Sequence, residues 1–179
     1  PNKPLELINN KEMILHVYEA AKKTNTGEVY VATPDQKIID LIKDVGGKAV
    51  LTSLDHQTGT DRVYEVFKNQ LKSEPNVIVN LQGDMPNIDP KVITNLISYM
   101  EEGKCDIGTL ASSFSSDEEI ADENNVKVAV KEKLDNNQFG QASDFFRTDV
   151  KNYKIFYHHV GIYAFTNKAL VRYVSLKRS

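Results

Sequence analysis

Residues 77–90 read VIVNLQGDMPNIDP, and this stretch indicates the fold class. Val77–Leu81 is an apolar run typical of a buried strand, and turn-forming residues follow it directly. Asp89 and Pro90 then have the residue types of a helix N-cap and a first helical position. Open α/β sheets bind ligands where their strands end, so Asp84 is a candidate ligand residue. The same Gly-Asp pair is also typical of a plain turn.

The first half of the chain alternates between strand-like and helix-like segments. We expect helices over 11–23, from a Thr33 N-cap to Val45, over 63–71 and from Asp89 to Met100, and strands over 28–33, 48–52 and 77–81. Alternation at this spacing predicts a mainly parallel sheet covered by helices.

The second half is richer in strand patterns. Strands are expected over 106–113, 126–131 and 154–165, loops over 115–125 and 134–141, and a helix over 167–175. At 179 residues the chain is predicted to form a single domain, 1–179. We divide it into a βα half, 1–103, and a β-rich half, 104–179.

Composition excludes several classes of protein. A net charge of −3 argues against a dedicated nucleic-acid binder. The sequence contains no run of 18 apolar residues and so predicts no membrane span. The single cysteine, Cys105, cannot form an internal disulfide, so a cytoplasmic location is expected. The signatures of P-loop enzymes, dinucleotide oxidoreductases, zinc proteases and serine hydrolases are absent from the sequence.

A second polar segment, DHQTGTDR, occupies residues 55–62 and opens a predicted helix. Amides and hydroxyls at a helix N-terminus favour anionic or polar ligands. Thr58 or Thr60 is equally suited to be a plain N-cap. Lys3, ahead of the first helix, is placed either to neutralise phosphate charge or simply to be solvated at the terminus.

A third candidate segment is the strand-like run that contains His158 and His159. Adjacent strand residues face opposite sides of a sheet, so the two histidines are poorly placed to share a metal. Tyr157, His159 and Tyr163 fall on one face by this alternation. Such a polar, aromatic face indicates either a ligand pocket or a solvated side of the sheet.

Together these segments resemble the 3-deoxy-manno-octulosonate cytidylyltransferases, also called CMP-Kdo synthetases, over nearly the whole chain. The resemblance is carried by KPLELINNKEMILHVYEAA, VYVATPDQKI, GGKAVLTSLDHQTGTDRVYEVF, VIVNLQGDMPNIDP, NVKVAV, HHVGIYAF and RYVSLK. The blocks DHQTGTDR and VNLQGD, in this order, are its most specific part.

The resemblance implies a nucleotide-diphospho-sugar transferase fold, which is a three-layer α/β/α sandwich with a mainly parallel sheet. It implies a cytoplasmic, Mg²⁺-dependent homodimer that converts CTP and Kdo to CMP-Kdo and pyrophosphate for lipopolysaccharide synthesis. The anomeric hydroxyl of the sugar would attack the α-phosphate in line. Positioning and charge neutralisation would supply most of the catalysis.

The resemblance also implies roles for particular residues. Asp84 would hold Mg²⁺, and Lys3 would stabilise the pyrophosphate. The implied nucleotide-binding residues are Lys3, Thr58, Gly59, Thr60, Arg62 and Gln82. The implied sugar-binding residues are Gln82, Arg147, His159 and Tyr163. The first half would therefore bind the nucleotide, and the second half would bind the sugar and form the dimer surface.

Some positions depart from the family's pattern. The family opens with a strand and a loop of the form IPARxxSTRLPGKPL, of which only residues 1–5 are present here, and Met85 stands where Glu is usual. We expect a partial enzyme with impaired turnover. The alternatives are another sugar nucleotidyltransferase, such as a CMP-sialic acid synthetase, and a non-catalytic nucleotide-binding remnant.

Overall fold

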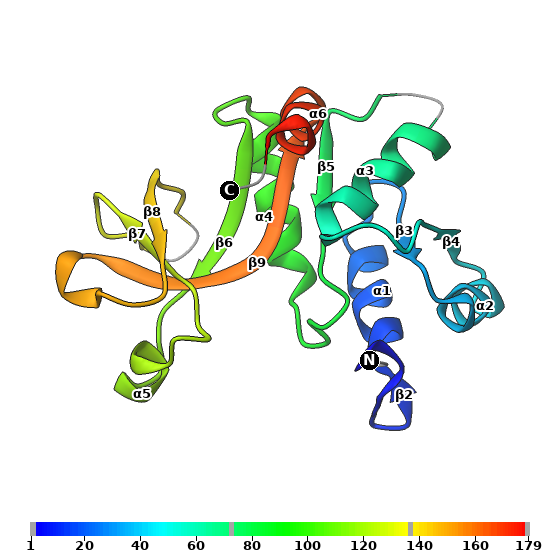
Figure 1. The fold of residues 1–179 in the computed structure, drawn as a ribbon, viewed down its shortest axis with the longest axis horizontal. Coiled ribbons are helices and arrows are strands. Elements are labelled where there is room, and N and C mark those ends of the chain that lie inside the picture. The colour runs from blue at the N-terminus through cyan, green and yellow to red at the C-terminus, as the bar shows by residue number, and fades with distance from the viewer. Residues whose placement is uncertain (1–2, 72–73, 136–137, 178–179) are drawn as a thin grey trace. The chain divides into compact units, whose positions relative to one another are not determined.

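The computed structural model describes residues 3–71, 74–135 and 138–177, and the chain forms two compact units. The first unit contains residues 1–108 and 162–179, and the second contains 109–161. The sequence suggested halves of 1–103 and 104–179. In the structure the chain returns to the first unit at Ile162, because the long strand β9 (Phe156–Thr166) pairs there with β5 (Val77–Asn80) (Figure 1).

The first unit consists mainly of the helices and strands expected from the sequence. Its helices are α1 (Met13–Lys23), α2 (Gln36–Asp44), α3 (Gly59–Gln70), α4 (Pro90–Glu101) and α6 (Asn167–Ser175). Its further strands are β3 (Tyr30–Thr33) and β4 (Lys48–Leu51), preceded by a 3-10 turn η1 (Lys3–Leu5) and a short hairpin of β1 (Leu7–Ile8) and β2 (Lys11–Glu12). The hairpin was not expected from the sequence.

Strand direction differs between the two strand pairs of the first unit that involve β3 and β5. β3 and β4 pair in parallel, from Tyr30↔Lys48 to Thr33↔Leu51, because helix α2 carries the chain back between them. β5 and β9 pair antiparallel. The α/β class is confirmed, with the parallel pairing in the βα part of the chain.

The start of α2 differs from the sequence prediction. Asp35, and not Thr33, is the N-cap, since its side chain accepts a hydrogen bond from the backbone N–H of Lys37 at 2.9 Å. Thr33 is buried as the last residue of β3, and its hydroxyl accepts from the N–H of Asp35. At α4 the predicted cap is confirmed, because Asp89 accepts from the N–H of Lys91.

The apolar faces of the helices form the core. Ile14 and Leu15 of α1 pack with Ile38 and Ile42 of α2 in one buried cluster. Gly47 follows α2 at a close approach, because a Cβ placed there would lie 2.6 Å from Ile42 Cγ2 and 2.9 Å from the Ile42 carbonyl oxygen.

We predict that Gly47→Ala destabilises the protein by about 1–3 kcal/mol, since the added methyl group overpacks against Ile42. Gly27→Ala is the matched control, because a Cβ at Gly27 meets nothing within 4 Å. Urea unfolding followed by circular dichroism measures both. Equal losses of stability in the two variants would contradict the packing argument.

The second unit contains most of β6 (Ile107–Ser112), then α5 (Asp117–Ala121), β7 (Lys127–Val130), β8 (Ala142–Phe146), the 3-10 turn η2 (Val150–Asn152) and the first half of β9. β7 pairs antiparallel with both β8 and β9. β8 was not expected, and its mostly exposed residues explain why an apolar pattern did not reveal it. α5 lies inside the segment expected to be a loop. Part of the other expected loop, residues 136–137, lies outside the described residues.

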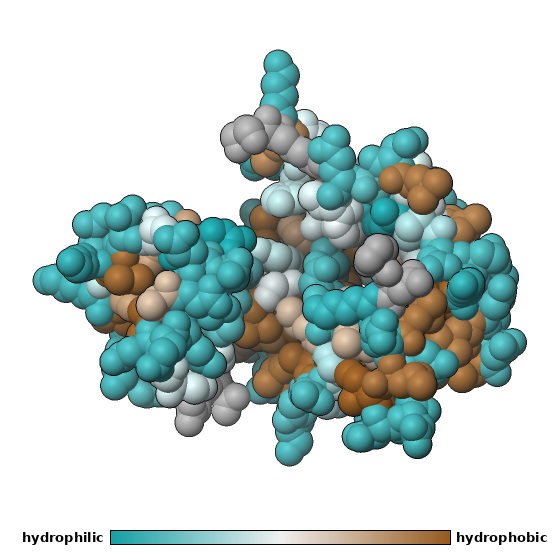
Figure 2. Space-filling view, turned by 60° about the horizontal axis from the view of Figure 1, so that its bottom comes forward, coloured by the Kyte–Doolittle hydropathy of each residue, from teal (hydrophilic) through white to brown (hydrophobic). Residues whose placement is uncertain are grey.

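The face of the molecule in Figure 2 is mainly hydrophilic, with smaller apolar areas between the polar side chains. Leu54 and Leu7 are the most exposed large apolar residues, at 81% and 63%. Scattered apolar residues of this kind are normal on soluble proteins. Among the described residues, no helix combines the length and apolar character needed to span a membrane.

Candidate active site

The end of β5 brings together the carboxylate and the cation that the sequence singled out. Lys3 Nζ lies 3.0 Å from Asp84 Oδ2, although the two residues are 81 positions apart. Their side chains are 65% and 48% exposed, so both groups are open to a ligand from solvent. The candidate carboxylate therefore lies at the strand end where open α/β sheets bind ligands.

The N-terminus of α3 is formed by a capping box. The hydroxyl of Thr58 accepts from the N–H of Asp61 at 3.3 Å, and the Asp61 carboxylate accepts from the N–H of Thr58 at 3.1 Å. Thr58 is thus the N-cap that the sequence allowed. The positive end of the helix dipole lies at this position, which favours an anionic ligand. The nucleotide-binding role of Thr58 stays a prediction.

Side chains from the end of β5 contact the N-terminus of α3. Asn80 is 4% exposed, and its Nδ2 donates to Thr60 Oγ1 at 3.1 Å. A Cβ at Gly59 would lie 3.4 Å from Gln82 Nε2, so the Gln82 amide lies directly against this glycine. Asn80 was missed in the sequence, although a polar residue ending an apolar strand was the available signal.

Arg62 of α3 holds the loop that follows β4. Its Nη1 donates to Thr52 Oγ1 at 2.7 Å and to the Ser53 carbonyl oxygen at 2.8 Å. Thr52 is only 5% exposed. In this structure Arg62 therefore positions the loop, and its direct contact with a nucleotide stays a prediction.

Glu65, one turn further along α3, holds the same loop. Its Oε2 accepts from the Ser53 N–H at 3.0 Å and from His56 Nε2. These hydrogen bonds, with His56 first and Ser53 second, lower the pKa of Glu65. We call Arg62 and Glu65, with the loop residues Thr52, Ser53 and His56 that they bind, the loop brace. The sequence showed no sign of the Glu65 contacts.

We predict that Glu65→Gln lowers the free energy of unfolding at neutral pH. The free energy of unfolding of the variant should also fall less steeply as the solution is made acidic. A carboxyl whose pKa is lowered by folding stabilises the fold above its unfolded pKa of about 4.3, and this stabilisation is lost as the pH falls through the folded value. The difference in the free energy of unfolding between wild type and variant should therefore be largest near pH 7 and shrink below about pH 4. Urea midpoints across this range measure it. The exposed Glu6→Gln is the control, and a pH-independent difference for Glu65→Gln would contradict the assignment.

The predicted sugar-side residues fall in both units. Tyr163 belongs to the first unit, directly opposite Asn80 in the pairing of β9 with β5. Burial, and then Tyr173, raise the pKa of Tyr163, so its phenol stays protonated at neutral pH. Arg147 and His159 belong to the second unit.

Arg147 and His159 have defined partners within the second unit. Arg147 Nη1 donates to the carbonyl oxygens of Glu123 and Asn124 at 3.0 and 2.8 Å. His159 is 9% exposed, and its Nε2 lies 3.0 Å from Thr109 Oγ1. Burial, and then His158, lower the pKa of His159, which favours a neutral imidazole. The burial of His159 differs from the solvated sheet face that the sequence left open.

The metal ligand predicted from the sequence is Asp84. Within residues 3–71, 74–135 and 138–177, no three His, Cys, Asp or Glu side chains are grouped as a metal site. A single half-exposed carboxylate nevertheless fits Mg²⁺, which is commonly held by one or two carboxylates together with substrate phosphates. The residues present are thus compatible with an ion that arrives with a triphosphate.

Comparison with known proteins adds independent information. Residues 1–179 match a family model described as cytidylyltransferase. An 8-amino-3,8-dideoxy-manno-octulosonate cytidylyltransferase of Shewanella piezotolerans is 37% identical over 98% of this chain and 73% of its own length. A 3-deoxy-manno-octulosonate cytidylyltransferase of Brucella ovis is 38% identical over 98% of this chain and 70% of its own length.

Solved structures show the same relationship. A CMP:2-keto-3-deoxy-manno-octonic acid synthetase complexed with CTP superposes with a TM-score of 0.84 at 36% identity, covering 100% of this chain and 73% of that chain. A 4-diphosphocytidyl-2C-methyl-D-erythritol synthase of Anaerococcus prevotii has a TM-score of 0.62 at 12% identity, covering 98% of this chain and 73% of that chain, and shows likeness of fold alone. The nucleotidyltransferase fold expected from the sequence is confirmed.

Proposed function

Because this chain belongs to the cytidylyltransferase family, and is thus a nucleotidyltransferase, we propose that it transfers CMP from CTP to Kdo. The products are CMP-Kdo and pyrophosphate, and CMP-Kdo would serve lipopolysaccharide synthesis. The observation that carries the proposal is the Lys3–Asp84 pair at the end of β5, since it offers a phosphate-binding cation beside a metal-binding carboxylate.

In the proposed reaction the anomeric hydroxyl of the sugar loses its proton to solvent, and its oxygen forms a bond to the α-phosphorus of CTP. The bond from that phosphorus to the bridging oxygen of the β-phosphate breaks, and pyrophosphate leaves. Lys3 binds the negative charge that develops on the leaving group. The N-terminus of α3, with Thr58, Gly59 and Thr60, binds and orients the nucleotide, and the Gln82 amide packed on Gly59 limits where it can lie.

Mg²⁺, when bound, supplies further neutralisation of phosphate charge, and Asp84 is the residue that would hold it. Asp84 is a suitable ligand because its carboxylate is half-exposed at the strand end. In this structure Asp84 contacts Lys3, and Lys3 is the residue that would bind the phosphates.

Sugar-binding roles are proposed for Gln82 and Tyr163 in the first unit and, separately, for Arg147 and His159 in the second unit. A guanidinium has five N–H groups, and both backbone contacts of Arg147 arise from Nη1, so Arg147 suits the sugar carboxylate. Neutral His159 and the protonated Tyr163 hydroxyl suit sugar hydroxyls. A cytoplasmic homodimer is part of the same proposal, and the single cysteine fits a reducing compartment.

The test measures CTP binding by calorimetry and pyrophosphate release with Mg²⁺ and three sugars, namely Kdo, 8-amino-3,8-dideoxy-manno-octulosonate and sialic acid. We expect CTP binding and slow pyrophosphate release that requires Kdo. A preference for the 8-amino sugar would favour a second candidate function, transfer of CMP to 8-amino-3,8-dideoxy-manno-octulosonate, the sugar in the name of the 37% identical Shewanella relative. Binding of CTP without turnover on any sugar would indicate a non-catalytic nucleotide-binding module. No binding of CTP would overturn the proposal.

A further inference from the structure

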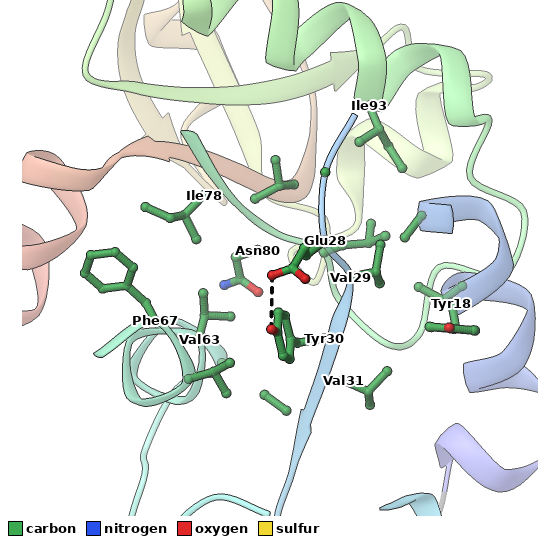
Figure 3. A pocket seen from close by; sticks show the side chains of 18 of the residues that line it. Tyr18, Glu28, Val29, Tyr30, Val31, Val63, Phe67, Ile78, Asn80 and Ile93 are labelled. Atoms are coloured by element: carbon green, nitrogen blue, oxygen red, sulfur yellow. Dashed lines mark hydrogen bonds between the residues drawn. The ribbon is translucent and has the colours of Figure 1, made fainter. Parts of the chain in front are cut away.

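The two units differ in the charge that they bury. In the first unit a cavity of about 640 Å³ lies beside β3 and β5, with Val63 and Phe67 of α3 among the side chains around it (Figure 3). The hydrogen bond drawn there joins Tyr30 to the exposed Glu28 at 3.1 Å. Among the described residues, no charged side chain that lines this cavity is buried. In the second unit, by contrast, Lys127 is a charged side chain with an exposure of 0%.

Lys127 of β7 binds two segments that are distant from each other along the chain. Its Nζ donates to the carbonyl oxygen of Asp122 at 2.7 Å and to that of Arg147 at 3.0 Å. Both of these acceptors are neutral backbone groups. Burial of an ammonium group against neutral acceptors is costly, and lysine is among the residue types that are least often fully buried. An apolar side chain would fill this space at lower cost, so the lysine indicates a role beyond packing.

The sheet register explains how Lys127 reaches Arg147. On β7, Lys127 lies opposite Phe146 of β8 on one side and His158 of β9 on the other. Phe146 is the last residue of β8, and Arg147 follows it directly. The lysine therefore lies beside the point at which the chain leaves the sheet. Its bond to the Arg147 carbonyl oxygen fixes the backbone from which the arginine side chain starts.

The side chain of Arg147 reaches the same loop that Lys127 holds. Arg147 Nη1 donates to the carbonyl oxygens of Glu123 and Asn124, the two residues that follow Asp122. Lys127 and Arg147 thus bind three consecutive carbonyl oxygens. The loop is stiffened from within, because Asp122 Oδ1 accepts from the backbone N–H of Asn124 at 2.8 Å and from its Nδ2 at 2.9 Å.

The consequence is an exposed arginine that is fixed at both ends. Lys127 holds the Arg147 backbone directly, and it holds the acceptors of the guanidinium through the loop that begins at Asp122. An exposed arginine ordinarily samples many rotamers, and a ligand that binds it must order it. Here the fold orders the side chain before any ligand arrives.

We propose that Lys127 is a positioning residue, which fixes the guanidinium of Arg147 for the carboxylate of an acidic sugar. Lys127 itself is fully buried and acts only through the arginine and the loop. For the identity of the ligand this inference rests on the proposed function. The ordering of Arg147 is a property of the second unit and is measured separately.

The first part of the test follows the order of the Arg147 side chain in the full 179-residue chain. Lys127→Met keeps the length of the side chain and removes its donors. NMR relaxation of the Arg147 Nε–H group, assigned by its absence from Arg147→Ala, measures the order. We expect the order parameter to fall below about 0.6, the range of flexible groups. Amide exchange over residues 122–125 should become about tenfold faster.

Val128→Ala is the matched control, because Val128 is the next residue of β7 and is also buried, at 3% exposure. It should destabilise the protein through the loss of apolar packing, and it should leave the Arg147 signal ordered. An unchanged Arg147 signal in Lys127→Met would overturn the proposal. Equal loss of order in Val128→Ala would show a general effect of destabilisation and would overturn it too.

The second part measures the sugar. With CTP saturating, the KM for Kdo should rise by about tenfold in Lys127→Met, because the sugar must then order the arginine itself. The KM for CTP should stay within about twofold of the wild-type value. In the Arg147→Ala background, Lys127→Met should cause no further rise in the KM for Kdo. An equal rise in both backgrounds would show that Lys127 acts independently of Arg147, and would overturn the proposal.

Two further outcomes are distinguishable. If Lys127→Met does not fold, the exposed Asp122→Ala is measured in its place, since it removes the bonds that stiffen the loop; an unchanged Arg147 signal would again overturn the proposal. If the wild-type chain neither turns over Kdo nor shifts its Arg147 signal when Kdo is added, the proposed function fails. The order of Arg147 in Lys127→Met then still decides whether the lysine positions it.

Discussion

Asp84→Asn is expected to remove the enhancement of CTP binding by Mg²⁺ and to lower pyrophosphate release by about 10²–10³-fold, the loss typical of one transition-state charge contact. The amide keeps the size of the side chain but loses the charge that a hard divalent cation requires. The half-exposed position of Asp84 predicts little change in folding. Calorimetry with CTP in the presence of Mg²⁺ or of EDTA measures the first effect.

Asp40→Asn is the matched control, since Asp40 is exposed on α2 and contacts Gln36 there. It should leave CTP binding unchanged. If Asp84→Asn still binds CTP more tightly with Mg²⁺ than with EDTA, Asp84 is a turn residue that contacts Lys3 and nothing more. Lys3→Met separates phosphate binding by Lys3 from metal binding by Asp84, because this variant should weaken CTP binding even with EDTA present.

Most elements of the first unit, the β1–β2 hairpin excepted, were predictable because local signals agree there. The run VIVN combines strand propensity with turn-forming residues after it, and the helix starts at Thr58 and at Asp89–Pro90 each combine helix propensity with a suitable N-cap. At the start of α2 two residues are suited to be the N-cap. Thr33 is not the N-cap because it is the buried end of β3, and Asp35 binds the N–H of Lys37 instead.

Other side-chain partners depend on contacts between residues far apart in the sequence and could not be predicted from it. Lys127 follows the alternating pattern of a strand, yet its side chain is fully buried, because Nζ reaches the carbonyl oxygens of Asp122 and Arg147 at 2.7 and 3.0 Å. The pairing of Asn80 with Thr60 joins residues 20 positions apart. A single sequence predicts neither, because side-chain partners depend on tertiary packing.

The loop brace is the part of the candidate site that most changes the interpretation of the sequence. Arg62 was predicted to bind the nucleotide directly, whereas here its Nη1 binds Thr52 and Ser53. Hydrogen bonds to charged groups are each worth about 1.5–3 kcal/mol. Losing them should loosen the loop that leads to Thr58 and Gly59, and thereby the N-terminus of α3.

We therefore predict that Arg62→Ala weakens CTP binding by about ten- to a hundredfold, as a loss of about 1.4–2.8 kcal/mol implies. Amide exchange over residues 52–58 should become faster. Arg62→Lys should recover part of the affinity, because both bonds arise from one nitrogen and an ammonium group can donate to two acceptors. A bidentate contact with phosphate would not be recovered by lysine. The exposed Arg172→Ala is the control, and lost affinity with unchanged loop exchange would show direct contact in place of bracing.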